Sequence, residues 1–255
     1  MKVTILGSGT SHGVPMIGCS CAVCTSLDPR NRRTRASALV QFDHRNVLID
    51  TSIDLRRQAL AAGLQRVDAI LFTHQHADHI CGFDDVRRFC AIQRACIPCY
   101  GNDRTIQRLR HVFDYVLDSV EHDFFDVPVV AFNIVDRPFL LFGRTVIPVP
   151  LVHGRWPCFG YRLGNFAYCT DVKEIPPESM ELLRGLDTLV LGALRMRPHP
   201  THFSLEQALA VIAELRPRRA YLTHIAHDLD HQTTNAALPA DVQLAYDGLV
   251  IDVDS

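Results

Sequence analysis

Four side chains of metal-binding type lie within seven consecutive residues in the first third of the chain. Residues 73–79 read T-H-Q-H-A-D-H, so three histidines and one aspartate directly follow the apolar run 69–72. Imidazole nitrogens and carboxylate oxygens are the donors that first-row divalent metals take up. Polar groups packed this densely at the end of a buried strand would be costly to desolvate without such a partner. The motif therefore predicts a metal site and metal-dependent chemistry.

Three further potential ligands follow strand-like runs later in the chain. His153 follows residues 145–152, and Asp171 and His224 follow two similar apolar runs. Ligands delivered from the ends of several strands are expected to converge on one edge of a sheet. One structural zinc takes four ligands, whereas seven ligands fit two metals that share a carboxylate. A structural site remains the alternative, and a dinuclear centre is the simpler interpretation.

The T-H-Q-H-A-D-H motif, with His153, Asp171 and His224 downstream, resembles the signature of the metallo-β-lactamase superfamily over nearly the whole chain. This resemblance implies an α/β fold of the αββα type, in which two mixed sheets are flanked by helices and the metals lie at one edge. It places Asp171 between two divalent ions and divides the other six ligands equally: His74, His76 and His153 on one ion, and Asp78, His79 and His224 on the other.

A second group of metal-binding residues lies near the N-terminus. Cys19, Cys21 and Cys24 form a C-S-C-A-V-C segment, whose spacing suits thiolates around one soft metal ion. Three thiolates need a fourth ligand, and His227, three residues beyond His224, is the candidate. Clustered cysteines in an intracellular chain bind metal more often than they form disulfides. We therefore expect a closed Cys3His structural zinc site, with free loop thiols as the alternative.

Three segments together resemble the PhnP family of phosphodiesterases: G-S-G-T-S-H-G-V-P-M-I-G-C-S-C-A-V-C near the start, H-A-D-H-I-C-G-F-D-D-V-R-R-F, and L-T-H-I-A-H-D. The resemblance implies a structural zinc at the cysteine cluster beside the dinuclear centre. It also implies a homodimer. His202 matches the position of a family histidine that protonates the leaving group, and His199 is the nearby competitor. His12 is either a substrate-binding residue or a solvated loop histidine.

The expected function is hydrolysis of a small phosphodiester, such as a cyclic ribosyl or nucleotide phosphodiester, by a hydroxide that bridges the two metals. Asp78 and His202 are the expected catalytic residues, and His202 would protonate the departing alkoxide. The two ions are Mn²⁺ or Zn²⁺, because His and Asp accept both. The metal motif alone fixes hydrolysis but not the bond.

Several alternatives remain open within this superfamily. A transfer-RNA 3′-processing nuclease usually carries an extra arm for the RNA, whereas core elements account for most of the chain between Asp171 and His224. A lactone or thioester hydrolase would use the same metal motif. A non-catalytic accessory protein, like the pyrroloquinoline-quinone biosynthesis protein B group, would share the cysteine cluster but would not need all seven ligands.

The composition is typical of a single enzyme domain spanning residues 1–255. Hydrophobic residues make up 47% and charged residues 21% of the 255, and this length permits one large core. We expect no leader and no membrane span, and the odd number of cysteines, nine, favours the cytoplasm. The net charge of -2 gives no general attraction to nucleic acid. The expected partner is the small phosphodiester that the resemblance implies, rather than nucleic acid or a membrane.

Hydrophobic periodicity and turn residues predict the elements that position these ligands. We expect strands at 2–6, 37–42, 46–50, 68–72, 97–100 and recurrently through 128–170, and helices at 54–62, 84–95 and 103–118. Ser204 and Gln207 have capping-box spacing at the start of an amphipathic helix that Pro217 stops. Two arginine clusters, at 30–35 and 87–94, are either solvated or contact an anionic substrate.

Overall fold

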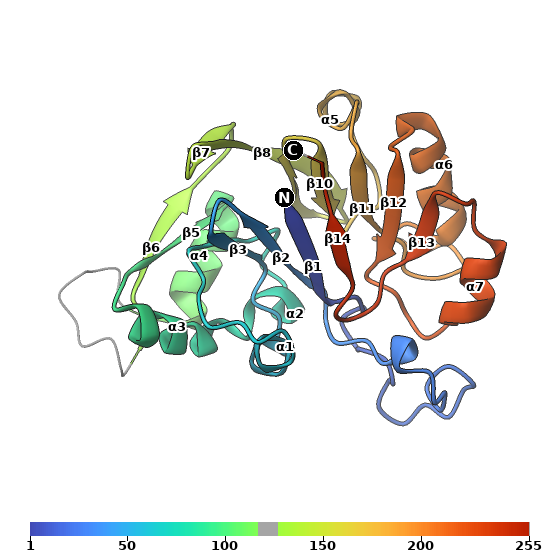
Figure 1. Cartoon of the computed structure of the whole chain (residues 1–255), viewed down its shortest axis with the longest axis horizontal. Coiled ribbons are helices and arrows are strands. Elements are labelled where there is room, and N and C mark those ends of the chain that lie inside the picture. The colour runs from blue at the N-terminus through green and yellow to red at the C-terminus, as the bar shows by residue number, and fades with distance from the viewer. Residues whose placement is uncertain (117–126, 255) are drawn as a thin grey trace.

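The computed structural model describes residues 1–116 and 127–254, and two seven-stranded sheets stand at its centre (Figure 1). The first sheet contains, in spatial order, β14 (Val250–Asp252), β1 (Lys2–Gly7), β2 (Ser37–Phe42), β3 (Arg45–Ile49), β4 (Ala69–Leu71), β5 (Ile97–Gly101) and β6 (Val130–Ile134). The second contains β13 (Val242–Leu244), β12 (Arg219–Thr223), β11 (Thr188–Gly192), β10 (Phe166–Cys169), β9 (Trp156–Leu163), β8 (Arg144–His153) and β7 (Phe139–Leu141).

Helices cover the outer face of each sheet, as Figure 1 shows. The first sheet carries α1 (Leu55–Ala61), α2 (Ala77–Ile80), α3 (Val86–Gln93) and α4 (Asp103–Val112), with short 3₁₀ turns at Pro29–Asn31 and Phe83–Asp85. The second sheet carries α5 (Pro177–Leu182), α6 (Leu205–Leu215) and α7 (His231–Ala237). The order of layers is therefore helix, sheet, sheet, helix, and the predicted αββα sandwich is confirmed.

Both faces of the central strands are buried. Along β2, Ala38 and Val40 belong to the core between the two sheets, whereas Leu39 belongs to the core under α1, α3 and α4. A third core fills the space between the second sheet and its helices. Burial on both faces explains why these strands read as nearly continuous apolar runs rather than as alternating ones.

Each sheet combines antiparallel and parallel pairing. Strands β14 to β3 and β7 to β10 pair antiparallel, whereas β3 to β6 and β10 to β13 pair parallel. In parallel sheets, the chain segments that bind ligands leave from the carboxyl ends of the strands, which lie together at one edge. Most of the predicted metal ligands follow the parallel strands β4, β10 and β12, and His153 ends the antiparallel strand β8.

The predicted elements are largely present, with shifts at their ends. The predicted helix at 84–95 is a 3₁₀ turn followed by α3, and the helix predicted at 103–118 ends at Val112, while residues 117–118 lie outside the described residues. The capping box on α6 is confirmed, because Ser204 Oγ accepts from the Gln207 amide at 3.3 Å and the Ser204 amide donates to Gln207 Oε1 at 3.1 Å. Within the described ranges, no helix is long and apolar enough to cross a membrane.

Candidate metal centre

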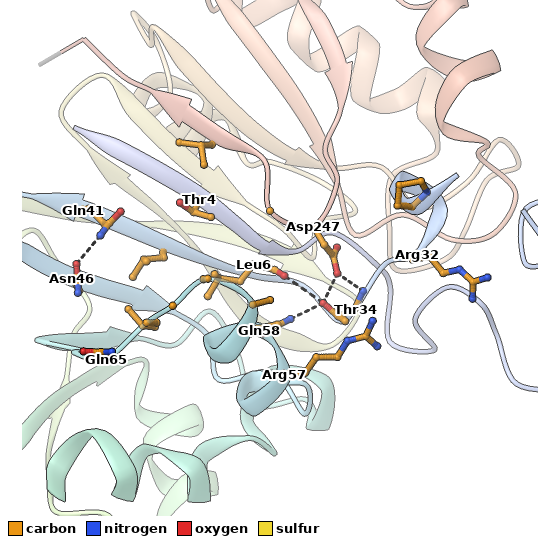
Figure 2. Close-up of a pocket in the computed structure, with 18 residues that line it drawn as sticks. Thr4, Leu6, Arg32, Thr34, Gln41, Asn46, Arg57, Gln58, Gln65 and Asp247 are labelled. Carbon is orange, nitrogen blue, oxygen red and sulfur yellow. Dashed lines mark hydrogen bonds between the residues drawn. The ribbon is translucent and has the colours of Figure 1, made fainter. Parts of the chain in front are cut away.

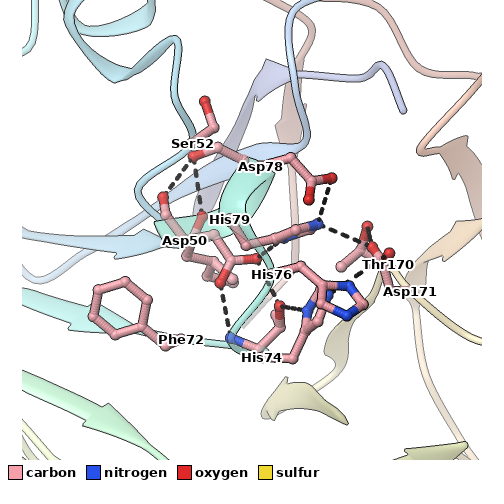
Figure 3. A network of polar contacts seen from close by, with 12 residues as sticks. Asp50, Ser52, Phe72, His74, His76, Asp78, His79, Thr170 and Asp171 are labelled. Carbon is pink, nitrogen blue, oxygen red and sulfur yellow. Dashed lines mark hydrogen bonds and ion pairs between the residues drawn. The ribbon is translucent and has the colours of Figure 1, made fainter. Parts of the chain in front are cut away.

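The seven predicted ligands meet at the edge between the two sheets. The first four lie on the loop after β4 and on the short helix α2, His153 ends β8, and Asp171 and His224 follow β10 and β12. Figure 3 shows the ligands of the first motif gathered around Asp171. Residues separated by up to 150 positions in the sequence are therefore neighbours in space.

One group of donor atoms consists of His74, His76, His153 and Asp171, and all four lie within 4.8 Å of one another. His153 Nε2 is 3.3 Å from His76 Nδ1 and 3.7 Å from Asp171 Oδ2. His74 Nε2 is 3.9 Å from the same carboxylate oxygen. Four donors placed tetrahedrally at about 2.1 Å from one ion would be about 3.4 Å apart. The spacing of this group therefore fits one metal ion.

The second group consists of Asp78, His79 and His224. His79 Nε2 lies 3.3 Å from Asp78 Oδ2, and His224 Nε2 lies 3.8 Å from the same oxygen. Asp171 also reaches this group, because its two oxygens lie 3.2 Å from His79 Nε2 and 3.3 Å from His224 Nε2. The structure thus places Asp171 between the two groups, as a carboxylate shared by two ions would have to lie.

Asp50, which no sequence motif indicated, orients two of the predicted ligands through hydrogen bonds. His79 Nδ1 donates to Asp50 Oδ2 at 2.7 Å, and the Thr73 hydroxyl donates to the same oxygen at 2.8 Å. The Thr73 oxygen then accepts from His74 Nδ1 at 3.0 Å. An imidazole whose Nδ1 carries the proton has a free lone pair on Nε2. Asp50 therefore turns the Nε2 atoms of His74 and His79 toward the cluster.

Several buried ring nitrogens in the cluster have no hydrogen-bond partner in the described part of the chain: His74 Nε2, His79 Nε2, His224 Nδ1 and His224 Nε2. Buried polar atoms are almost always satisfied, so a concentration of unsatisfied lone pairs indicates a missing binding partner. These atoms belong to both donor groups. The residues present therefore fit a pair of divalent ions.

The charges of the cluster also favour a bound cation. Burial would raise the pKa of Asp171, but His224 and His79 hold it well below its usual value. Burial lowers the pKa of His74 well below its usual value, and the neighbouring His79 adds to this effect. Burial would lower the pKa of His79 too, yet the surrounding carboxylates, Asp171 first, raise it well above its usual value. The ionised carboxylates therefore attract positive charge, which a metal ion can supply.

A cavity of about 530 Å³ opens over the cluster and is lined by both metal-binding and other residues, His202 and Trp156 among them. His202 Nδ1 lies 3.8 Å from Asp171 Oδ2, and its ring centroid lies 4.7 Å from those of His153 and His224. Burial first, and then His224, lower the pKa of His202 to about 3. His199 lies outside this cavity, 5.2 Å from His202 between ring centroids.

An adjoining cavity of about 290 Å³ is lined by His12, His199 and His202, so the structure places His12 next to the candidate site. The predicted arginine clusters do not line the cavity over the metal ligands. Arg33 is buried and donates to the carbonyl of Leu229 at 2.9 Å instead. A larger cavity of about 650 Å³ lies beside α1 (Figure 2), but it shares no lining residue with the metal cluster.

The structure brings Cys19, Cys21 and Cys24 together with His227, the candidate fourth ligand. The Sγ atoms of Cys19 and Cys21 lie 3.2 Å and 3.3 Å from His227 Nδ1, and the Cys24 thiol completes a group within 4.8 Å. Donors around one tetrahedral zinc, with Zn–S near 2.3 Å, would be about 3.7 Å apart, so the group has a fitting size. The backbone amide of Cys24 and then His227 lower the pKa of Cys21 to about 6, which favours a thiolate.

Residues 45–225 match the family model of the β-lactamase superfamily domain. The chain belongs to this superfamily. A solved structure described as a new diphosphatase from the PhnP family is 49% identical to it, covers 99% of this chain and 98% of that one, and superposes with a TM-score of 0.92. The chain is therefore a PhnP-like member of the metallo-β-lactamase superfamily.

Two other proteins with different names are also similar to this chain. An octanoyltransferase of Porphyromonas gingivalis is 38% identical over 259 residues, which are 100% of this chain and 52% of that protein. The Zn²⁺-bound structure of PqqB from Methylobacterium extorquens covers 99% of this chain at 20% identity, with a TM-score of 0.79. The chain spans about half the length of the curated relatives it matches first. PqqB therefore shares the metallo-β-lactamase fold with this chain.

Three residues of this metallo-β-lactamase site carried little signal in the sequence. Asp50 directly follows β3, and Asp171 follows β10 after one intervening residue, so the place of Asp50 at a strand end was the available clue. Arg155 and Trp156 lie beside His153 and line the cavity. Nothing in their local sequence indicates that both would face the metal ligands.

Proposed function

We propose that this chain uses two divalent ions to hydrolyse a phosphodiester bond in a small substrate, such as a cyclic ribosyl or nucleotide phosphodiester. The observation that carries the proposal is the convergence of two donor groups on one shared carboxylate, Asp171, below a cavity of about 530 Å³. That volume is in the range of small-molecule sites. The 49% identity to a PhnP-family structure supports phosphorus as the atom attacked.

Two ions would be held by the residues that the motif predicts, with three ligands on each side of Asp171: His74, His76 and His153, and Asp78, His79 and His224. A divalent pair supplies positive charge to the phosphoryl oxygens and lowers the pKa of water, so that a nucleophile forms at neutral pH. The donor set accepts either Mn²⁺ or Zn²⁺. We also propose one structural zinc at the cysteine cluster.

His202 is the proposed proton donor to the leaving oxygen. It lines the cavity and lies 3.8 Å from Asp171, whereas His199 does not line it. Its pKa, lowered to about 3 by burial and by His224, leaves the ring neutral before substrate binds. A bound phosphate would bring negative charge close to the ring, which favours protonation. Proton donation would therefore depend on the substrate itself, and Asp78 and Asp171 would stay ionised throughout.

A diphosphate is the second candidate substrate, because the 49% identical relative is described as a diphosphatase. Attack at phosphorus is the same for a P–O–P and a P–O–C bond, but the leaving groups differ. An alkoxide needs a proton when it departs, whereas a phosphate leaves without one at neutral pH. The dependence of the rate on His202 would therefore separate the two substrates.

The other relatives suggest different bonds. The match to the octanoyltransferase covers 52% of that protein. The match does not show whether the acyl-transfer activity belongs to the matched half or to the other half. A ribonuclease Z of Methanococcus maripaludis is 23% identical over 60% of this chain. Acyl transfer or hydrolysis would require activity on thioesters, and the nuclease would require activity on transfer-RNA precursors.

A hydrolysis screen of the purified protein tests the proposal. The protein, loaded with Mn²⁺ or with Zn²⁺, is offered 1,2-cyclic ribosyl phosphates, 2′,3′-cyclic nucleotides, linear nucleotide diesters, dinucleoside diphosphates, transfer-RNA precursors, lactones and thioesters. We expect turnover of small phosphorus substrates that requires added metal. Faster turnover of a thioester, a lactone or a transfer-RNA precursor than of every small phosphorus substrate would overturn it.

A further inference from the structure

A second cavity adjoins the metal cluster on the side of α4. It has a volume of about 550 Å³ and is lined by eight residues: Gln75, His76, Ala77, Arg104, Gln107, Arg108, His111 and Trp156. Two of them, His76 and Trp156, also line the cavity over the metal ligands. The two cavities therefore adjoin at His76 and Trp156, and a predicted metal ligand lies at their boundary.

Two guanidinium groups are packed against the ring of Trp156. Arg104 Cζ lies 3.9 Å and Arg155 Cζ 4.7 Å from its centroid. Cation–π contacts favour each arginine separately, but two cations on one ring repel each other. In the described part of the chain neither arginine forms an ion pair with a carboxylate. The charge of this pair is therefore not neutralised by the described residues around it.

Further positive charge lies along the same face of α4. Arg104, Arg108 and His111 are spaced four and three residues apart, so their side chains lie on one side of the helix. All three are exposed and line the cavity. None of the described residues that line it is acidic. A guanidinium fork matches the geometry of phosphate oxygens, so this face suits a phosphate group.

The cavities continue past the metal ligands to the opposite side. Ring centroids of neighbouring residues form a row from Trp156 to His76 at 6.5 Å, to His153 at 5.0 Å and to His202 at 4.7 Å. Beyond His202 lies the cavity that contains His12 and His199. A small cyclic diester would fill only the middle of this row, whereas a linear substrate can extend in both directions.

We propose that Arg104, Arg108 and His111 bind a second phosphate group of a linear substrate. This rests on the proposed function, in which His202 protonates the leaving half. The leaving half then lies toward His202, and the retained half extends toward α4. The substrate class is a linear phosphodiester or diphosphate whose retained half carries a further phosphate.

A matched pair of substrates tests this subsite. Both are p-nitrophenyl diesters of thymidine 5′-phosphate, and one carries an added phosphate at the 3′ oxygen. Their leaving group is identical, so only the retained half differs. We expect a kcat/KM about tenfold higher for the substrate with the added phosphate, since two charge-assisted contacts to phosphate easily supply a factor of this size. The double variant Arg104→Gln with Arg108→Gln should reduce this preference to less than about twofold.

The control variant is Arg88→Gln on α3, which removes one positive charge, half of what the double variant loses, from an exposed helical arginine outside the cavity. It should keep the full preference for the added phosphate. The proposal is overturned if the wild-type protein shows no preference, or if the double variant keeps the preference of the wild type. Loss of the preference in Arg88→Gln as well would also overturn the proposal, because overall charge rather than this cavity would then set the preference.

A binding measurement separates this proposal from the proposed function. Trp156 is the single tryptophan of the chain, so its fluorescence reports directly on the cavity beside α4. Inorganic phosphate should change this fluorescence in a saturable way, with a Kd about tenfold weaker in the Arg104→Gln, Arg108→Gln variant than in Arg88→Gln. If neither diester is hydrolysed but this difference appears, the proposed function fails and the subsite stands. If both diesters are hydrolysed but phosphate binds the two variants equally, the subsite fails alone.

Discussion

The metal cluster and the cysteine cluster are linked through one loop, which carries His224 and His227, but they differ in construction. The metal cluster takes its donors from the ends of strands, orients them through Asp50, and opens onto a cavity. The cysteine cluster takes its donors from two loops and is packed with Val14 and Val23 in a small apolar core of its own. An open site with oriented ligands suits catalysis, whereas a closed thiolate site suits stability.

One short loop serves both clusters. His224 belongs to the metal cluster, and His227, three residues later, belongs to the cysteine cluster. Between them, Ile225 is held by the N-terminal loop, because its amide donates to Ser8 at 2.9 Å and its carbonyl accepts from Thr10 at 3.1 Å. The same loop therefore carries one residue of each cluster, His224 and His227.

The strongest test of this contrast is Asp171→Ala. Asp171 contacts both donor groups, so its loss should disrupt the whole metal pair, and we expect phosphodiesterase activity to fall by about 10³-fold or more. The sheets do not depend on this side chain, so circular dichroism should show the fold unchanged. Asp136→Ala, at an exposed carboxylate that forms an ion pair with Arg137, is the control. Activity within tenfold of wild type in Asp171→Ala would contradict the dinuclear assignment.

His202→Ala tests whether His202 donates a proton to the leaving oxygen. If His202 protonates the leaving oxygen, its loss should cost about 10²-fold or more with an alkyl or ribosyl diester, and much less with a p-nitrophenyl diester, whose phenolate needs no proton. His199→Ala should show no such dependence on the leaving group. Equal losses for both substrates in His202→Ala would indicate that His202 positions the phosphate rather than donating a proton.

Asp50→Asn tests the orientation of the ligands. Removing the charge weakens the hydrogen bonds that fix His79 directly and His74 through Thr73, so metal affinity or activity should fall by about 10- to 100-fold, the usual range for such supporting residues. Titration with Mn²⁺ under activity assay measures both quantities. Asp68→Asn is the matched control, because Asp68 is also buried but pairs with Arg45 and Arg66 away from the cluster.

The same contrast explains how much the sequence could predict. The αββα fold and the superfamily are confirmed, because periodic apolar runs and a compact motif of ligands are local signals. The structure also brings the seven predicted donors together, although their role as ligands stays a prediction. Short elements such as α2, α5 and α7 were missed, since four to seven residues show too little periodicity to stand out.

The residues that support the site could not be predicted from the sequence. Asp50 lies 29 positions before His79, and Arg104 lies 52 positions before Trp156. These contacts depend on the register of β3 against β4 and on the position of α4 beside the sheet edge. Such relations arise only in the folded structure. The arginine clusters that the sequence did indicate, at 30–35 and 87–94, do not line the cavity over the metal ligands.

The last prediction concerns the cysteine cluster and has the smallest effect on activity. Cys21→Ser should weaken zinc binding there and loosen the loop that carries His227. We expect the thermal midpoint to fall by roughly 4–8 °C, since a loss of about 2 kcal/mol shifts a chain of this size by that amount. Activity at low temperature should fall by less than about threefold, because His224 is also held by its own strand β12.

Zinc content completes this test. Mild chelation should remove the ions of the open cluster first and leave about one zinc per chain, because thiolates in a closed site hold zinc tightly. That residual zinc should be absent from Cys21→Ser and present in Cys81→Ser, which makes the same chemical change at an exposed cysteine outside the cluster. A chelated wild-type protein without zinc, together with an unchanged midpoint in Cys21→Ser, would show that these thiols do not form a metal site. The stability of the loop would then have to come from other contacts, such as those of the buried Arg33 with the carbonyls of Ala226 and Leu229.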